Sequence, residues 1–284
     1  MRRENTKQTK ITKQTKILSF FVCFVIFVCF VFSLRSDVGA HQEEKASSLE
    51  ERMVSRLSSG DEEQRMDALV QLGALFTIAP GAISTTTTSA LGNSLHNDHS
   101  AVVRALAART LELSGDARVV DILMSALPKE RQIAVRKAII YAMALYPSSR
   151  TTASFISLTK DKNHEVRAAA TFALAESADP QAQVTLLDVL RKRNKDEDAF
   201  SRSQAARGLG RIQNREAIDS LLKALTGDKS DEVRRESARA LWFIATKQDS
   251  EVIEALRQAT LSADPYLTIA ADQALANINS RAGI

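Results

Sequence analysis

The sequence predicts an all-α fold, an α-solenoid in which about six to seven antiparallel helix pairs form a right-handed superhelix. A short motif recurs at intervals of 31 to 35 residues, which is typical of helical repeats. Within each copy the apolar residues follow the 3.6-residue period of a helix. The most strand-like stretch is Thr85–Thr88. Because it stands where a second helix is due, between Pro80-Gly81 and Gly92-Asn93, we interpret it as a poor helix or a loop.

The first helix of each pair is marked by an arginine with an acidic residue six positions before it. Successive arginines are 32, 31, 35 and 32 residues apart. A weaker copy centres on Thr268, and a degenerate leading copy centres on Arg65. The five acid–arginine pairs are Asp98 and Arg104, Glu130 and Arg136, Asp161 and Arg167, Asp196 and Arg202, and Asp228 and Arg234.

Small and apolar residues follow the arginine at fixed offsets. The residue three positions later is usually alanine or serine, as in Ala107 and Ser237, and the residue seven later is leucine or methionine. These offsets lie on one face of a helix. Small side chains there let neighbouring helices approach closely, and the larger residue fills the remaining space. The residues at the seventh position are Leu111, Met143, Leu174, Leu209, Leu241 and Leu275.

A second helix is expected to follow in each copy, starting near a residue suited to capping. The expected caps are Asp116, Ser149, Asp179, Asn214 and Asp249. Apolar residues such as Leu186, Leu221 and Leu256 give this helix a buried face. Neither helix of a pair could bury its apolar face alone, whereas a stack of pairs forms one continuous core.

The region before the repeats has the layout of an export signal. Residues 1–16 are polar and basic, residues 17–34 form an uncharged apolar run, and Val38 and Ala40 suit a cut before His41. An uncleaved membrane anchor is the alternative, because the run is just long enough to span a bilayer. Positive charge before the run keeps the N-terminus inside in both cases. We therefore expect a body that is periplasmic, secreted or part of the cell envelope.

Three regions follow from this reading. Residues 1–40 are a signal peptide or N-terminal membrane anchor, residues 41–59 are a linker and an N-terminal capping helix, and residues 60–284 are the solenoid. Leu49, Met53 and Leu57 are four residues apart, as expected for the capping helix. The two cysteines, Cys23 and Cys29, both lie in the apolar run, so the mature body is expected to contain no disulfide.

The repeat motif resembles the HEAT repeat, in the subclass named after phycobilisome lyases. The motif is an acid, five residues, an arginine, then small residues and a leucine, followed by a turn and a capped helix. The stretch Ala205–Ile212, followed by Asn214–Leu225, is most similar to it. The resemblance covers about residues 60–280. It implies a solenoid that presents a surface, and it implies little about activity.

The acid–arginine pairs recur once per repeat, which favours a structural role over a binding groove. We interpret them as a polar ladder that ties each repeat to the next, since arginine offers five donors in a fixed fork. The predicted ladder consists of Asp98, Arg104, Glu130, Arg136, Asp161, Arg167, Asp196, Arg202, Asp228 and Arg234.

An enzymatic alternative comes from the resemblance. Deoxyhypusine hydroxylase has similar repeats and holds two irons through several His-Glu pairs, whereas His164-Glu165 is the only such pair here. The phycobilin lyases also share the repeat, but export argues against a bilin pocket. Because phosphate loops, nucleophile elbows and zinc spacings are also missing, we predict no catalytic residue, no metal and no cofactor.

The charge distribution also limits the class of partner. Residues 1–40 have a net charge of +5 and the remaining 244 residues have a net charge of −1, which together give +4 for the chain, so no basic stripe suggests nucleic acid. We expect a non-enzymatic scaffold that binds a protein or peptide on a concave wall built from the second helices. An anchored subunit of a membrane complex, touching the bilayer only through residues 17–34, is another possibility.

Few residues stand out as partner contacts. Tyr146 precedes Pro147 near a helix end and could face a ligand, while Arg191 and Arg193 belong to a basic run in the longest repeat. For the other prominent aromatic residues we expect packing within or between repeats. These residues are Tyr141, Trp242, Phe243 and Tyr266.

Overall fold

The computed structural model describes residues 39–78, 83–191 and 199–280. The chain divides into two units, residues 1–52 and 53–284, and the second contains the repeats. The expected export signal or anchor lies almost wholly outside the described residues. Among the described residues, no helix combines the length and the apolar character needed to cross a membrane.

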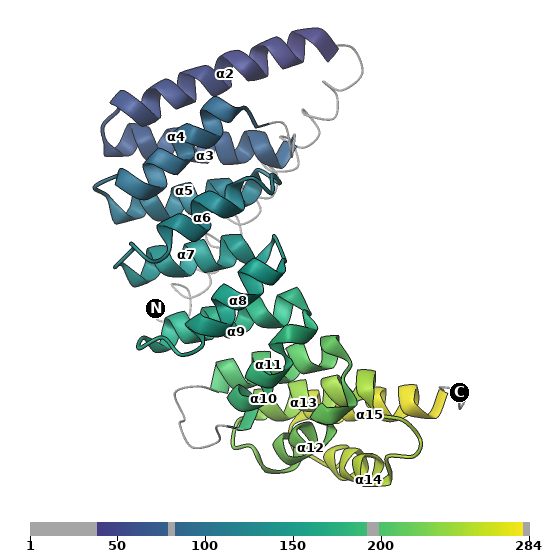
Figure 1. The fold of residues 1–284 in the computed structure, drawn as a ribbon. Helices are drawn as coiled ribbons and strands as arrows, with labels where there is room; N and C mark the ends of the chain where they lie inside the picture. The colour runs from purple at the N-terminus through teal and green to yellow at the C-terminus, as the bar shows by residue number, and fades with distance from the viewer. Residues whose placement is uncertain (1–38, 79–82, 192–198, 281–284) are drawn as a thin grey trace, which may run out of the picture. The chain divides into compact units, whose positions relative to one another are not determined.

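The predicted all-α solenoid is confirmed. Helix pairs follow one another in chain order through residues 53–284, and the described residues contain no strand (Figure 1). The pairs are α3 (Glu62–Ile78) with α4 (Thr85–Asn97), α5 (Ala101–Leu113) with α6 (Val119–Ala126), α7 (Ile133–Ala144) with α8 (Ser149–Leu158), α9 (His164–Ser177) with α10 (Gln183–Arg191), α11 (Ala199–Ile212) with α12 (Ile218–Gly227), and α13 (Asp231–Ile244) with α14 (Ser250–Ala259), and the stack ends with α15 (Pro265–Ser280).

The two ends of the repeat series differ from the sequence interpretation. The leading copy around Arg65 is a complete pair, α3 and α4, whereas the copy around Thr268 has only α15 among the described residues. Thr85–Thr88 is the first turn of α4, because the Ser84 hydroxyl accepts the N–H of Thr87 and caps the helix. The segment is thus a helix and not a loop.

The expected caps of the second helices are only partly correct. Asp179 and Asn214 each cap a short 3₁₀ turn that leads into the helix, Pro180–Ala182 and Arg215–Ala217 respectively. Ser148, not Ser149, caps α8, where its hydroxyl accepts the N–H of Thr151. The error of one residue arises because either serine satisfies the sequence preference for the cap.

The first helices of the pairs form one row along the stack and the second helices form another, and the first helices pack more closely. Each first helix from α3 to α15 contacts the first helix of the next repeat. The interface is lined by small residues and by leucines such as Leu209 and Leu241, which are fully buried. At Gly210 the approach is so close that an added Cβ would lie 2.8 Å from the Cα of Ala240. The predicted role of the small residues therefore agrees with the packing.

The helix before the repeats is longer than expected. It is α2 (Gly39–Ser59), so residues 41–48, interpreted as a linker, are helical. Met53 and Leu57 are buried within the second unit, as their spacing suggested. Arg56 in the same helix pairs with Asp67 of α3 at 2.9 Å. The C-terminal turns of α2 thus belong to the repeat unit.

Candidate functional site

The acid–arginine residues form contacts between successive repeats. The guanidinium of Arg104 donates from Nε to Glu130 Oε2 at 2.7 Å and from Nη2 to Oε1 at 3.1 Å. Arg136 donates to Asp161 at 2.6 Å, and Arg65 of the leading copy donates to Asp98 at 2.6 and 3.0 Å. These three arginines therefore pair with the acid of the next repeat. For Arg104 and Arg136, that acid is not the one six residues before them.

The same guanidinium groups also bind their own loops. Arg104 Nη1 donates to the backbone oxygen of Asp98 at 2.8 Å, and Arg167 and Arg234 make the equivalent bond to Asp161 and Asp228. The acid six positions before the arginine thus contributes its carbonyl oxygen to that arginine and its carboxylate to the preceding one. This double use accounts for the fixed spacing of the motif.

The last contact of the series is displaced by one residue. Arg235, not Arg234, donates to the carboxylate of Asp264, from Nε at 2.7 Å and Nη2 at 2.9 Å. Arg234 pairs instead with Asp231 in its own helix. The sequence reasoning missed this pair because the copy around Thr268 has its acid four residues before the central position instead of six. Asp196 lies outside the described residues.

Two carboxylates of this ladder, those of Asp161 and Glu130, are stabilised in their charged form. Hydrogen bonding from Arg136 lowers the pKa of Asp161 in spite of partial burial. For Glu130, burial acts to raise the pKa, but bonds from Arg104 and from the backbone N–H groups of Gln132 and Arg131 outweigh it and lower the pKa. The ladder residues with a described partner therefore form ion pairs that join successive repeats.

A different position on the first helices carries an exposed strip. The residues five positions after each ladder arginine are partly or fully exposed. Three consecutive members touch one another: the rings of Tyr141 and Phe172 meet edge to face at 5.5 Å, and the guanidinium carbon of Arg207 lies 5.4 Å from the centre of the Phe172 ring. We call this set the first-helix strip, and it comprises Arg109, Tyr141, Phe172, Arg207 and Arg239.

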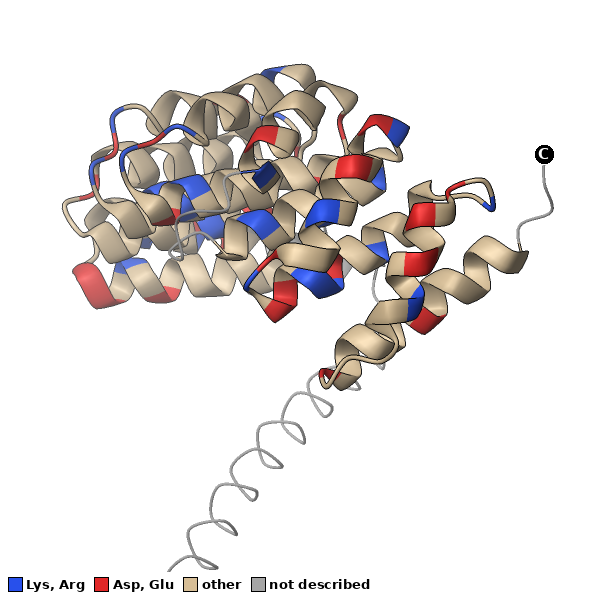
Figure 2. Cartoon of the chain, turned by 90° about the horizontal axis from the view of Figure 1, so that it is seen from below, with Lys and Arg blue, Asp and Glu red and all other residues tan. Residues whose placement is uncertain are grey.

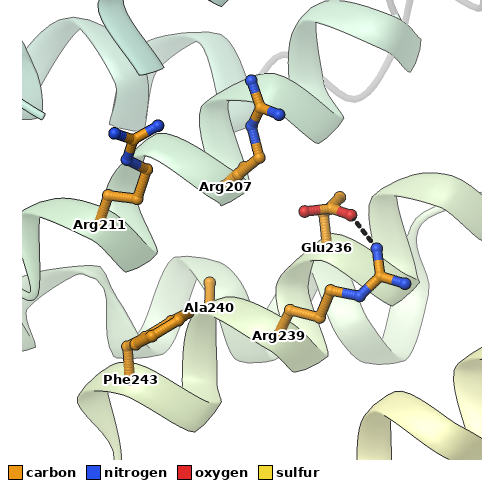
Figure 3. Close-up of a pocket in the computed structure, with 6 residues that line it drawn as sticks. All are labelled: Arg207, Arg211, Glu236, Arg239, Ala240 and Phe243. Carbon is orange, nitrogen blue, oxygen red and sulfur yellow. Dashed lines mark hydrogen bonds and ion pairs between the residues drawn. The ribbon is translucent and has the colours of Figure 1, made fainter. Parts of the chain in front are cut away.

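At its C-terminal end the strip borders a groove between α11 and α13. Arg207 and Arg211 stand side by side on α11, and the facing residues belong to α13 (Figure 3). The groove has a volume of about 460 Å³ and is open on one side. Its lining residues are Arg207, Arg211, Glu236, Arg239, Ala240 and Phe243. It is thus a shallow surface hollow, suited to side chains of a partner.

The charged residues of the groove form ion pairs with residues of the first helices. Glu176 of α9 accepts from Arg207 and, at 2.8 Å, from Arg211, so one carboxylate is shared by two guanidinium groups. Arg239 pairs with Glu236, which is almost buried. The Nε of Arg207 is buried and has no hydrogen-bond partner among the described residues. The accessible cationic side chains of the groove are those of Arg211 and Arg239, which are 41% and 46% exposed.

Two further aromatic residues of the first helices are exposed. Phe243 is 42% exposed and stacks on Trp242 with ring centres 5.6 Å apart. Tyr266 of α15 is 61% exposed and lies under the guanidinium of Arg235. The sequence interpretation expected packing within or between repeats for most of the prominent aromatic residues, and Phe243 and Tyr266 are exceptions. Phe243 stands nine residues after the central Arg234, and Tyr266 stands two residues before the central Thr268. Both positions lie on the outer face of the row of first helices, which is why the side chains are exposed.

The residues predicted as partner contacts lie elsewhere. The Tyr146 hydroxyl donates to the backbone oxygen of Glu112 at 3.1 Å, so it is engaged between repeats, and burial raises its pKa. Arg191 donates to the Ser220 hydroxyl of the next repeat at 3.1 Å. Arg193 lies outside the described residues. The hollow also involves first helices, whereas we expected a wall of second helices.

The single His-Glu pair has no metal-binding surroundings. Glu165 pairs with Lys137 at 2.6 Å, which lowers its pKa. In the described part of the chain, no three His, Cys, Asp or Glu side chains come together in a way that could hold a metal ion. Basic and acidic residues are distributed among the helices (Figure 2).

Comparison with known proteins supports the repeat architecture. The family model described as HEAT repeats matches residues 88–175, 123–198, 152–242 and 186–276. No curated protein sequence matches the chain. Among solved structures, the Escherichia coli protein YibA is 20% identical with a TM-score of 0.56, covering 88% of this chain and 92% of that one.

Two further solved structures have similar scores. An engineered protein is 24% identical with a TM-score of 0.54, covering 82% of this chain and 68% of its own. Yeast importin-beta, Kap95p, is 14% identical with a TM-score of 0.54, covering 81% of this chain and 40% of its own. At these identities the likeness concerns the fold alone.

Proposed function

The chain belongs to the HEAT-repeat family, and on that premise we propose that it is an exported, non-enzymatic scaffold that binds a protein or peptide along the first-helix strip. The observation that carries this proposal is the continuous contact from Tyr141 through Phe172 to Arg207. These side chains come from three successive repeats and remain partly exposed. A surface that continues across repeat boundaries suits an extended partner.

The composition of the strip supports a protein partner. Aromatic residues and arginine are enriched where proteins bind one another, because they combine large contact area with directional polar groups. Yeast Kap95p, a solenoid of similar fold, binds RanGDP according to the description of its complex. The partner of the present chain is proposed only as a protein or peptide.

Site-specific photo-cross-linking in the host cell tests this proposal. A photoreactive amino acid replaces Phe172 or Arg239 on the strip, and in a matched control it replaces Val184, which is 69% exposed on the second helix α10. The proposal expects a defined cross-linked product of higher mass from the two strip positions and none from Val184. Products from Val184 alone would move the partner to the other row of helices and overturn the proposal.

Export is a separate part of the proposal, based on residues 1–40. N-terminal sequencing of the protein isolated from its host is expected to start at His41 if the signal is cleaved. Retention of residues 1–40 would favour the anchored subunit of a membrane complex. In both cases external protease should digest the body in cells with a permeabilised outer barrier and an intact inner membrane. Protection of the body under these conditions contradicts export.

A further inference from the structure

We propose that the groove between α11 and α13 binds an acidic peptide segment, with alternate carboxylates on Arg207 and Arg211 and a neighbouring apolar side chain on Phe243. The inference rests on the proposed function, because it names the chemistry of the partner at one end of the first-helix strip. The observations concern the charge, the spacing and the apolar wall of the groove.

The charge of the lining favours an anion. Three of the six lining residues are arginines, and one, Glu236, is acidic. The side chains of Arg211 and Arg239 are 41% and 46% exposed, so a ligand can reach them. The surplus is local, because residues 41–284 together carry a net charge of −1. Because the rest of the body is nearly neutral, an anionic ligand is attracted to this cationic hollow in particular.

A carboxylate of the chain itself already binds two of these arginines. Glu176 approaches from α9 and places one oxygen on Arg207 and the other on Arg211. Arginine has five donors, and among the described residues each of these two uses one nitrogen for this contact. Because the side chains of Arg207 and Arg211 remain 34% and 41% exposed, nitrogens that do not contact Glu176 can bind a further carboxylate.

The spacing of the arginines matches an extended peptide. Arg207 and Arg211 are four residues apart on a helix, which separates their Cβ atoms by about 6 Å. Side chains two residues apart on an extended chain point to the same side and are about 6.6 Å apart. A peptide with acidic residues at alternate positions therefore presents its carboxylates in step with the two guanidinium groups.

The apolar part of the groove favours a peptide with an apolar side chain near its carboxylates. Ala240 and the exposed ring of Phe243 line the hollow from α13 (Figure 3). The opposite side of the Phe243 region is supported by its stacking on Trp242. An aliphatic side chain next to the carboxylates would bury apolar surface here, which adds affinity that a purely electrostatic ligand lacks.

The stacked pair also supplies a direct measurement. Trp242 is the only tryptophan of the chain, so its fluorescence reports on the groove. The probes are three end-capped synthetic peptides without aromatic residues: Glu-Ser-Glu-Ser-Leu, the same sequence with both Glu replaced by Gln, and the same sequence with both replaced by Lys. They are titrated into the protein as isolated from the cells that produce it.

We expect the Glu peptide to change the fluorescence saturably and to bind at least about tenfold more tightly than the Gln peptide, with no binding of the Lys peptide. Arg211→Gln should remove most of the difference between the Glu and Gln peptides, and Arg239→Gln, which removes a lining charge but no proposed carboxylate contact, should reduce it by a smaller factor. The matched control is Arg257→Gln on α14, whose arginine is likewise paired with a glutamate three residues before it and is exposed. This variant should bind the Glu peptide as the unchanged protein does.

Equal binding of the Glu and Gln peptides to the unchanged protein would overturn the inference without any variant. Competition by an oligothymidylate that binds more tightly than the Glu peptide would also overturn it, in favour of a nucleic acid. If the strip gives cross-links in cells while the two peptides bind equally, only this inference fails. If neither strip position gives a cross-link, the proposed function itself fails.

Discussion

The guanidinium of Arg202 meets the carboxylate of Asp228 across the boundary between two repeats, with Nε 2.8 Å from Oδ2 and Nη2 3.0 Å from Oδ1. The side chains are only 3% and 2% exposed. Parallel two-point bonding of this kind fixes direction as well as distance. The other ladder arginines with a described partner are more exposed, so this pair is the most deeply buried of the described set.

Removing the acid of this pair should be strongly destabilising. Asp228→Ala removes the carboxylate from the buried guanidinium of Arg202, and breaking a buried ion pair in this way costs about 3–5 kcal/mol. Asp228 also accepts the backbone N–H of Ser230 at 2.9 Å, so the turn before α13 is weakened as well. Urea denaturation followed by circular dichroism measures the change in the free energy of unfolding.

An exposed ion pair serves as the control. Arg150 and Asp121 also join neighbouring repeats, at 2.9 Å, but their side chains are 64% and 73% exposed. Asp121→Ala should therefore lower stability by no more than about 1 kcal/mol. Similar losses for the two variants would show that burial of the Arg202–Asp228 pair has no energetic consequence.

A second prediction concerns the leucines between first helices. Leu209 and Leu241 are fully buried, so Leu209→Ala or Leu241→Ala should each cost about 2–5 kcal/mol in the free energy of unfolding. Leu261 is 79% exposed, and Leu261→Ala should change the free energy by only a few tenths of a kcal/mol. A small loss at Leu209 would contradict the assignment of this position to the core.

These two features were accessible from sequence for a common physical reason. The ladder and the leucines recur in every repeat because the same helix contact recurs, so periodicity reveals them. Periodicity did not reveal that Arg104 pairs with Glu130 instead of Asp98, since both acids lie at the motif position. The pairing depends on how far one repeat is displaced from the next, which the sequence does not state.

The strip and the groove were not predictable in the same way. Their residues differ from repeat to repeat, as Arg109, Tyr141 and Phe172 show, so no repeated pattern marks them. Their position, five residues after the ladder arginine, could be located in the sequence. That position alone does not identify a binding surface. The groove further needs the close approach of α11 and α13, which brings Arg207 and Glu236 onto one hollow.

The depressed pKa values give the stability a defined dependence on pH. Because the pKa of Asp161 is lower in the folded chain than in the unfolded chain, its ion pair stabilises the fold above the unfolded value, about 3.9. That contribution is lost as the pH falls through the folded pKa. Glu130 and Asp249 shift in the same direction. The melting temperature should therefore decrease as the pH is lowered from about 5 towards 2.

The variant Asp161→Asn isolates one part of this dependence. It removes the titrating group, so its melting temperature should be lower than that of the unchanged protein at pH 7 and should approach it at acidic pH. Scanning calorimetry over this range measures the difference. A constant difference between the two proteins at all pH values would show that ionisation of Asp161 contributes nothing to stability.

The close approach of the first helices makes the glycines of α11 sensitive to a single methyl group. At Gly208 an added Cβ would lie 2.8 Å from the Cα of Ala175, and at Gly210 the same distance from the Cα of Ala240. Alanine is preferred over glycine inside a helix by about 1 kcal/mol. Because backbone atoms oppose the new methyl group, overpacking of about 1–3 kcal/mol should outweigh this gain. Gly208→Ala and Gly210→Ala are therefore expected to destabilise the fold.

A glycine that faces only side chains separates the packing effect from helix propensity. An added Cβ at Gly92 of α4 would meet atoms of the Ile122 side chain, the nearest at 3.2 Å, and a side chain can move more easily than a neighbouring helix. Gly92→Ala should thus change the free energy of unfolding by less than about 1 kcal/mol in either direction. If Gly210→Ala were instead as stable as Gly92→Ala in urea denaturation, α11 and α13 would have to lie farther apart, and the groove formed by Arg211, Arg239 and Phe243 would change with them.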